Sequence, residues 1–183
     1  DLCKLITGSQ GTLGIITEIT FSLVPVEKEA NVIAIFMPSL DNLGEIVQDI
    51  VKLKPDSFES YDDYSMKLAV RFFFDFFRYL GFKKTIKLGL SFLHEVKMIL
   101  TGGIPKLTLI VEFTGNNPES VLEQLEKTAS ISKTYGFKYH IAKNKAEAEK
   151  YWKIRHESFN MLRKHMTGKR TAPFIDDIIV QPE

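Results

Sequence analysis

Arg155 is the residue whose surroundings in the sequence most directly suggest chemistry. The sequence from about residue 146 to about residue 165 predicts a helix, because side chains of one stripe recur at spacings of four, three, four and three. The members of this stripe are Ala148, Trp152, Arg155, Phe159 and Leu162. A guanidinium group is costly to bury alone, so Arg155 needs an anionic partner unless its stem covers apolar surface while its head reaches water. The partner is either a structural carboxylate, such as Asp176 or Asp177, or a ligand.

A second candidate binding segment lies near the N-terminal end, where Gly8, Gly11 and Gly14 recur at every third residue. Glycine permits tight turns and lets a ligand approach the backbone closely, so this spacing suits a binding loop. Three glycines alone are equally compatible with a plain turn before a strand. The alternation of apolar residues at 17–24 predicts such a strand, which ends at Pro25.

The other side chains capable of chemistry show no catalytic or metal-binding pattern. The sequence has four histidines, and their spacing is not that of metal ligands: His94, His140, His156 and His165. We expect His140 and His156 to be exposed to solvent, with His140 on the polar face of an alternating strand. Adjacent aspartates, at 62–63 and 176–177, point to opposite faces of a strand and make poor acid–base pairs. We therefore predict no catalytic residue and no metal ligand in this sequence.

Composition limits the class of protein. The 183 residues carry 24 Lys and Arg against 23 Asp and Glu, a formal charge of +1, so the chain lacks the basic field of a nucleic-acid binder. One cysteine excludes an internal disulfide framework. The 14 Phe predict a folded chain, long enough for one domain or one domain with an appendage. The chain starts at Asp1 without a recognisable signal peptide, and we expect it to be a fragment.

Two stretches of the sequence repeat the order strand, helix, strand. The expected elements are a strand at 32–37, a helix between Ser39 and Pro55, a strand at 58–61, a strand at 107–113, a helix between Asn117 and Gly136, and a strand at 137–141. Ser39 and Asn117 are the candidate helix caps, and Pro118 is the expected first helical residue. Two such halves predict an α+β, ferredoxin-like fold, which is an antiparallel sheet with helices on one face. Residues 64–105 form a helical insertion between the halves.

The insertion at 64–105 contains a strongly aromatic helix. Its charged residues fall at spacings of four, four and three and form one narrow polar stripe: Lys67, Arg71, Asp75 and Arg78. The remaining surface of this helix must be covered, either by the apolar stretch 88–100 or by a partner or membrane surface. Its apolar runs are shorter than the roughly 20 residues that a transmembrane helix needs.

Both ends of the sequence resemble one family of flavoenzymes. Residues 1–18, which contain Thr-Gly-Ser-Gln-Gly-Thr-Leu-Gly-Ile at 7–15, resemble the end of the flavin-binding domain in FAD-linked oxidases of the vanillyl-alcohol oxidase family. They are most similar to the branch with D-lactate dehydrogenase, the glycolate oxidase flavoprotein subunit and D-2-hydroxyglutarate dehydrogenase, in which Glu usually stands where this chain has Gln10. Residues 151–155 resemble the family's Trp-x-x-Arg helix, and residues 176–180 resemble its Glu-Asp-Val-x-Val segment.

The resemblance implies an enzyme that uses FAD to oxidise a D-2-hydroxy acid by hydride transfer. It implies that Arg155 binds the substrate carboxylate. It also implies that one set of residues lines FAD: Gly8, Ser9, Gly11, Thr12, Gly14 and Ile15. Residues 1–28 would be the C-terminal end of the FAD-binding domain, and residues 29–183 a substrate-cap domain that is incomplete at its C-terminus. The family's catalytic-histidine and metal-binding motifs do not occur in this sequence, so we expect the fragment alone to be inactive.

Two alternatives stay open at this stage. One is a non-catalytic α+β interaction or membrane-docking module, in which the aromatic insertion contacts a partner. The other is a relative of alkyl-dihydroxyacetone-phosphate synthase, which shares the family fold. The expected partners are a small hydroxy-acid substrate, the FAD domain of the same chain, and an electron acceptor or a membrane surface, but no nucleic acid. We expect a cytoplasmic protein and leave open peripheral contact with the inner face of the membrane.

Overall fold

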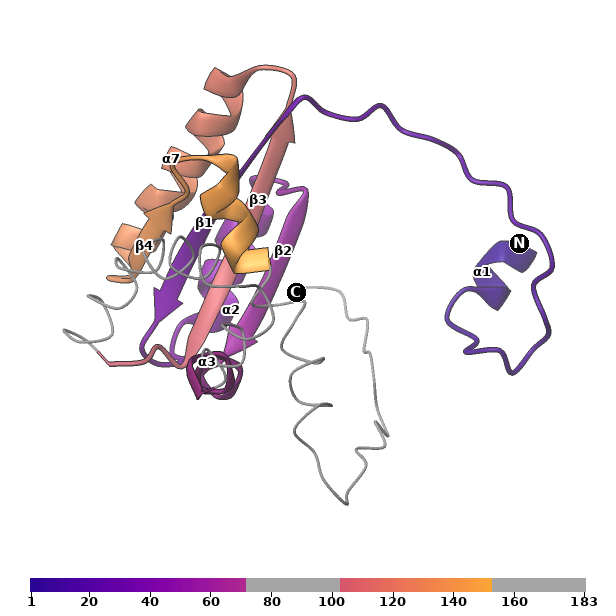
Figure 1. Cartoon of the computed structure of the whole chain (residues 1–183), viewed down its shortest axis with the longest axis horizontal. Coiled ribbons are helices and arrows are strands. Elements are labelled where there is room, and N and C mark those ends of the chain that lie inside the picture. The colour runs from indigo at the N-terminus through magenta and orange to yellow at the C-terminus, as the bar shows by residue number, and fades with distance from the viewer. Residues whose placement is uncertain (72–102, 153–183) are drawn as a thin grey trace, which may run out of the picture.

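A four-stranded antiparallel sheet forms the centre of the computed structural model, which describes residues 1–71 and 103–152 (Figure 1). The strands are β1 (Glu29–Met37), β2 (Ser57–Asp62), β3 (Leu107–Gly115) and β4 (Lys138–Ile141). Their order in the sheet is β2-β3-β1-β4, and each neighbouring pair is antiparallel. All four strands predicted for the two β-α-β halves are therefore present.

The connections follow the predicted ferredoxin-like pattern. The first half runs from β1 through α2 (Leu43–Val51) to β2, and the second from β3 through α7 (Pro118–Thr134) to β4. In each half the two strands are separated by a strand of the other half, so the halves interlock. The central pair, β1 and β3, is in register from Glu29 opposite Gly115 to Met37 opposite Leu107. The predicted α+β fold class is confirmed.

The ends of α7 lie where its capping residues predict. The Asn117 side chain accepts a hydrogen bond of 2.9 Å from the Glu119 N–H, and Pro118 is the first helical residue. The helix ends at Thr134, and Gly136 then adopts a left-handed φ of 73°, which glycine adopts without steric cost. Local sequence signals are sufficient to fix both ends of this helix.

The start of α2 differs from the prediction that Ser39 caps it. Asn42 precedes the helix with a left-handed φ of 60° and makes no side-chain cap bond. Ser39 instead forms a turn with Asp41, because its hydroxyl donates to Asp41 Oδ2 at 2.8 Å and accepts from the Asp41 N–H at 3.3 Å. The predicted apolar spacing is nevertheless correct, since Ile46 and Ile50 are both buried.

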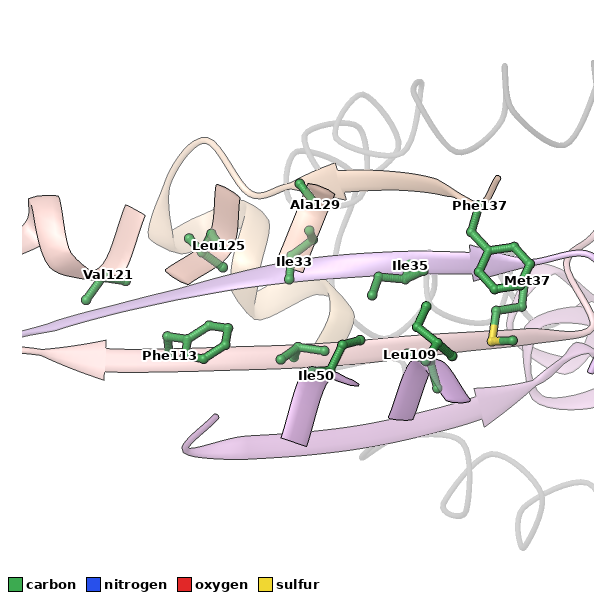
Figure 2. Packing of buried hydrophobic residues seen from close by; sticks show 12 residues of the cluster. Ile33, Ile35, Met37, Ile50, Leu109, Phe113, Val121, Leu125, Ala129 and Phe137 are labelled. Atoms are coloured by element: carbon green, nitrogen blue, oxygen red, sulfur yellow. The ribbon is translucent and has the colours of Figure 1, made fainter. Parts of the chain in front are cut away.

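One face of the sheet packs against α2 and α7. Figure 2 shows Ile33, Ile35 and Met37 of β1 pointing into this core. α7 contributes Val121, Leu125 and Ala129, and α2 contributes Ile46 and Ile50. A buried aliphatic side chain of this size contributes about 1.5–3 kcal/mol to folding. The helices of both halves thus share one core.

The second face of the sheet (Val32, Ala34, Phe36, Tyr61 and Ile110) is also buried. Helical residues 145–152 cover it through Ala148 and Tyr151, and α3 (Asp63–Arg71) contributes Met66. β1 and β3 are therefore buried on both faces, which explains why their sequences are nearly continuous apolar runs rather than alternating ones. The helix predicted from about residue 146 begins at 145, and its course beyond 152 lies outside the described residues.

The insertion predicted at 64–105 begins with α3, but residues 72–102, which include its aromatic segment, lie outside the described residues. The chain returns to the sheet through residues 103–106, where the Lys106 N–H donates to the Met37 carbonyl oxygen at 2.8 Å. Among the helices of residues 1–71 and 103–152, none is both long enough and apolar enough to cross a membrane.

Residues 1–28 form an arm that projects from the start of β1 (Figure 1). The arm holds one short helix, α1 (Leu2–Ile6), and continues as extended chain. The strand predicted at 17–24 is wrong for the described chain, because an extended segment becomes a strand only when its backbone groups pair with a neighbour. Its apolar side chains are correspondingly exposed, with Phe21 at 74% and Leu23 at 90%.

Candidate functional site

The predicted cofactor-binding residues lie in a loop that follows α1 on the N-terminal arm. Gly8, Gln10 and Gly11 all have left-handed φ angles, of 80°, 51° and 77°. The loop also closes on itself, since Thr12 donates to the Ser9 carbonyl oxygen through its N–H at 3.0 Å and through its Oγ1–H at 2.7 Å. The backbone conformation therefore accounts for glycine at positions 8 and 11.

The surroundings of this loop are open. A Cβ atom placed on Gly8, Gly11 or Gly14 meets no other atom within 4 Å, and the Ile15 side chain is 93% exposed. Nothing in the described part of the chain therefore accounts for glycine at position 14. An exposed backbone with small side chains fits one wall of a site for a large, flat cofactor such as FAD.

The predicted cofactor and substrate residues are not brought together in the described chain. The glycine loop lies on the projecting arm, well away from the sheet (Figure 1). Arg155, the predicted substrate-binding residue, lies outside the described residues. The helical residues that precede Arg155 in the sequence do lie on the sheet, where Ala148 and Tyr151 are buried.

A hydrogen bond joins the end of that helical segment to a central strand. Trp152 Nε1–H donates to Glu112 Oε1 at 3.1 Å, across 40 residues of sequence. Glu112 lies on β3, opposite Val32 of β1 and Ser57 of β2. Burial raises the pKa of the Glu112 carboxyl above its ordinary value, and the nearby Asp56 carboxylate raises it further. The hydrogen bond from Trp152 lowers this pKa, but burial has the larger effect.

A buried polar group ties the same helical segment to the edge strand β4. His140 Nε2 lies 3.1 Å from Glu147 Oε1, and Glu147 Oε2 accepts the Lys143 N–H at 2.7 Å. Burial by itself raises the pKa of Glu147, but the Lys143 N–H, His140 and Lys150 outweigh it and hold that pKa below the ordinary value. Lys150 Nζ lies 3.6 Å from Glu147 Oε1, with its side chain 1% exposed.

The prediction that His140 is exposed is wrong. The residue is 9% exposed, because the polar face of β4 is covered by helical residues 145–152 rather than by solvent. His156, for which exposure was also predicted, lies outside the described residues, as do His94, His165, Asp176 and Asp177.

The aspartates at 62 and 63 both have structural contacts. Asp62 Oδ1 accepts the Ser65 N–H at 2.8 Å at the start of α3. Asp63 Oδ2 accepts from Lys67 Nζ at 2.6 Å and lies 3.5 Å from Lys106 Nζ. In residues 1–71 and 103–152, no group of three or more His, Cys, Asp and Glu side chains is arranged to hold a metal ion.

Neither polar link of the helical segment, Trp152 to Glu112 or Glu147 to His140, is predicted by the sequence. The available signal for Glu112 was its place as the one charged residue in the apolar run 107–113. Such a residue either faces solvent or has a specific partner, and the sequence alone does not identify Trp152 as that partner.

Comparison with known proteins identifies the family. Residues 26–183 match the family described as FAD linked oxidases, C-terminal domain. Because the match covers most of the chain, the chain belongs to this family of FAD-linked oxidases. The resemblance seen in the residues at both ends of the sequence is confirmed.

Two sequence relatives carry more specific names. The chain is 25% identical over 193 aligned residues to the D-2-hydroxyglutarate dehydrogenase of Haemophilus influenzae, and the match covers all of this chain and 17% of that protein. It is 36% identical over 74 residues to the glycolate oxidase subunit GlcD of Escherichia coli, covering 39% of this chain and 15% of that protein. The chain thus spans less than a fifth of the length of either relative.

The fold is also present in a solved structure of alkyldihydroxyacetonephosphate synthase. The two chains superpose with a TM-score of 0.56 at 19% identity, over 88% of this chain and 29% of the synthase. At this identity the likeness concerns the fold alone, and it agrees with the family assignment.

Proposed function

We propose that this chain is the substrate-cap region of a flavin-dependent D-2-hydroxy-acid dehydrogenase. The observation that carries the proposal is the match of residues 26–183 to the C-terminal domain of FAD-linked oxidases. The names of both sequence relatives, a D-2-hydroxyglutarate dehydrogenase and a glycolate oxidase subunit, favour a 2-hydroxy acid as the substrate. The activity is proposed for the longer protein, because this chain spans only a small part of its relatives.

Residues 1–28 are proposed to complete the FAD-binding domain of that longer protein. Their exposed apolar side chains, such as Ile15 and Leu23, favour burial against a further domain. The residues that would line FAD are those of the glycine loop: Gly8, Ser9, Gly11, Thr12, Gly14 and Ile15. FAD, when bound, supplies the acceptor for a hydride.

In the proposed reaction the hydroxy acid loses a hydride from its α-carbon and a proton from its hydroxyl group, which leaves a 2-oxo acid. The role proposed for Arg155 is to bind the substrate carboxylate, because the planar guanidinium group pairs with both carboxylate oxygens. Such a pair would orient the α-carbon of the substrate in the site and would also contribute to the binding affinity. The proton acceptor is proposed to belong to another part of the longer protein.

Replacing Arg155 in the full-length, flavin-loaded protein tests the proposal. We expect Arg155→Ala to raise the KM for a 2-hydroxy acid by about a hundredfold, and Arg155→Lys to recover only part of the loss, since a charged hydrogen bond contributes about 1.5–3 kcal/mol. Flavin content should not change. Lys127→Ala is the matched control, because Lys127 is an exposed cation on α7, which packs on the sheet together with α2. An unchanged KM in Arg155→Ala would contradict the proposed role.

A further inference from the structure

The glycine loop of the N-terminal arm consists of two consecutive β-turns that share Ser9. In the first turn, residues 6–9, Thr7 has φ −59° and ψ 124° and Gly8 has φ 80°, as in a type II turn. The Ser9 N–H closes this turn by donating to the Ile6 carbonyl oxygen at 3.0 Å. A type II turn requires a positive φ at its third residue, so glycine at position 8 follows from the type of turn.

The second turn spans residues 9–12. Gln10 and Gly11 both have positive φ angles, of 51° and 77°, which is the pattern of a type I′ turn. The Thr12 N–H closes this turn by donating to the Ser9 carbonyl oxygen at 3.0 Å. Gln10 adopts its positive φ at a steric cost, because its Cβ crowds the neighbouring backbone, so the turn needs support beyond one backbone hydrogen bond.

Two threonine hydroxyl groups support the double turn. Thr12 Oγ1–H donates to the Ser9 carbonyl oxygen at 2.7 Å and thereby adds a second bond across the second turn. Thr7 Oγ1–H donates to the Cys3 carbonyl oxygen at 2.6 Å and joins the first turn to α1. These bonds link residues at most four apart, on an arm that lies away from the sheet (Figure 1). Local hydrogen bonds therefore set the shape of this loop.

The population of this shape affects how tightly the loop binds a ligand. The apparent dissociation constant equals the intrinsic constant divided by the fraction of molecules that have the binding conformation. The side chains of Thr7 and Thr12 are exposed, and a hydrogen bond in contact with water contributes only a small net stabilisation. Each additional hydrogen bond across such a turn therefore raises the fraction of molecules that are ready to bind.

We propose that Thr7 and Thr12 are positioning residues for the cofactor: their hydroxyl groups hold the double turn in the conformation that receives FAD. This inference rests on the proposed role of the glycine loop in lining FAD. Thr12 is already among the residues proposed to line FAD, whereas Thr7 lies just outside that set. Thr7 acts through the backbone of the loop and need not contact the cofactor.

The experiment measures the Kd for FAD in the full-length protein after its flavin has been removed, by following flavin fluorescence during a titration. Thr7→Val and Thr12→Val remove the hydroxyl group and keep the β-branched shape, whereas Thr7→Ser and Thr12→Ser keep the hydroxyl group. We expect each valine variant to raise the Kd about three- to tenfold, the scale of one lost hydrogen bond, and each serine variant to stay within about twofold of the parent.

Thr134→Val is the matched control for the loss of a threonine hydroxyl group. Thr134 Oγ1–H donates to the carbonyl oxygen of Ser130, four residues earlier, at 3.1 Å, as Thr7 does to Cys3. Thr134 lies on α7 rather than on the arm, so this variant should leave the Kd for FAD unchanged.

Gly8→Ala separates failure of the inference from failure of the proposed function. The change places a side chain at a φ of 80° and disfavours the first turn whatever the hydroxyl groups do. If Gly8→Ala raises the Kd but both valine variants leave it unchanged, the inference alone fails. If Gly8→Ala leaves the Kd unchanged, the proposed role of the loop fails first. A serine variant that binds FAD as weakly as its valine counterpart would also overturn the inference, because the hydroxyl group would then not be the cause.

The 183-residue chain provides a second measurement should a valine variant of the longer protein fail to fold. The Ser9 and Thr12 amide protons close the two turns. We expect the Ser9 amide proton to exchange faster with solvent in Thr7→Val, and the Thr12 amide proton to do so in Thr12→Val, each by about three- to tenfold. The free energy of unfolding in urea should not change, since the arm lies away from the sheet. Unchanged exchange rates in both variants would overturn the inference.

Discussion

His140 and Glu147 lie 3.1 Å apart, from Nε2 to Oε1, and join the edge strand β4 to the helical residues that cover the second face of the sheet. The Glu147 side chain is 15% exposed and also accepts the Lys143 N–H, so both of its oxygens have partners. The helical segment is therefore held at one end by Glu147 and at the other by Trp152.

We expect Glu147→Gln to lower the free energy of unfolding at neutral pH by about 1–3 kcal/mol, because the amide has one acceptor oxygen in place of two and loses the charge near His140 and Lys150. Urea unfolding measures this. The folded-state pKa of Glu147 is held below 4.5, so its stabilisation is present above about pH 4.5 and is lost as pH falls through the folded pKa. The difference in free energy of unfolding between the variant and the parent should therefore become smaller as pH falls over that range. Glu149→Gln, at an exposed position of the same segment, should have the same free energy of unfolding as the parent both at neutral pH and at acidic pH.

Glu112→Gln should make the chain at least as stable as the parent at neutral pH. The folded-state pKa of Glu112 is raised above 4.5, so protonation favours the folded state, and this contribution is lost as pH rises through the folded pKa. A neutral amide avoids that loss and still accepts the Trp152 N–H. A clear loss of stability in Glu112→Gln at neutral pH would show that ionised Glu112 has a favourable partner, against this expectation.

Trp152 is the single tryptophan of the chain, so its fluorescence reports on its own surroundings. We expect the emission of the 183-residue chain to change as pH falls through a value above about 4.5, where Glu112 takes up a proton. The same titration of Glu112→Gln should lack this transition. An identical transition in both proteins would assign it to another group.

Two glycines that differ in their surroundings provide a test of core packing. A Cβ on Gly115 would lie 3.2 Å from Val121 Cγ2, and Val121 is a stiff, buried side chain in the core, so Gly115→Ala should cost about 1 kcal/mol. Gly44, in the first turn of α2, has no atom within 4 Å of an added Cβ, so Gly44→Ala should stabilise by about 0.5–1 kcal/mol. Thermal unfolding of both variants checks the signs; equal effects would contradict the packing described for Gly115.

Removal of residues 1–28 tests the proposed domain boundary. β1 starts at Glu29, and all residues of the arm before it except the half-buried Ser9 are exposed. The shortened chain should therefore unfold in urea within about 0.5 kcal/mol of the 183-residue chain, as expected for the loss of surface residues. A much larger loss of stability would mean that the arm is part of the same folding unit as the sheet.

Much of the fold could be predicted because its signals are local. The apolar runs of β1 and β3 mark strands, and Asn117, Pro118 and Gly136 mark the ends of α7. Ser39 was assigned wrongly because a serine before a helix can form either a cap or a turn, and the sequence does not show which.

The second face of the sheet was harder to predict because its contacts join residues far apart in the sequence. The alternation in β4 shows which face is more apolar, but it does not show that a helix covers the other face and buries His140. The Glu112–Trp152 pair spans 40 residues and has no local signature. The left-handed φ angles of Gly8 and Gly11 agree with their residue type, but Gln10 also has a left-handed φ and Gly14 does not. The role of Arg155 stays a prediction.

The central claim is that the full-length protein oxidises a D-2-hydroxy acid with its flavin. Anaerobic mixing of that protein with D-2-hydroxyglutarate, D-lactate or glycolate, followed through the visible absorbance of the flavin, tests this most directly. We predict that at least one of them bleaches the flavin within a single turnover, that L-2-hydroxyglutarate and L-lactate do not, and that Arg155→Ala slows the bleaching at low substrate concentration. A flavin that stays oxidised with all three acids would contradict the account.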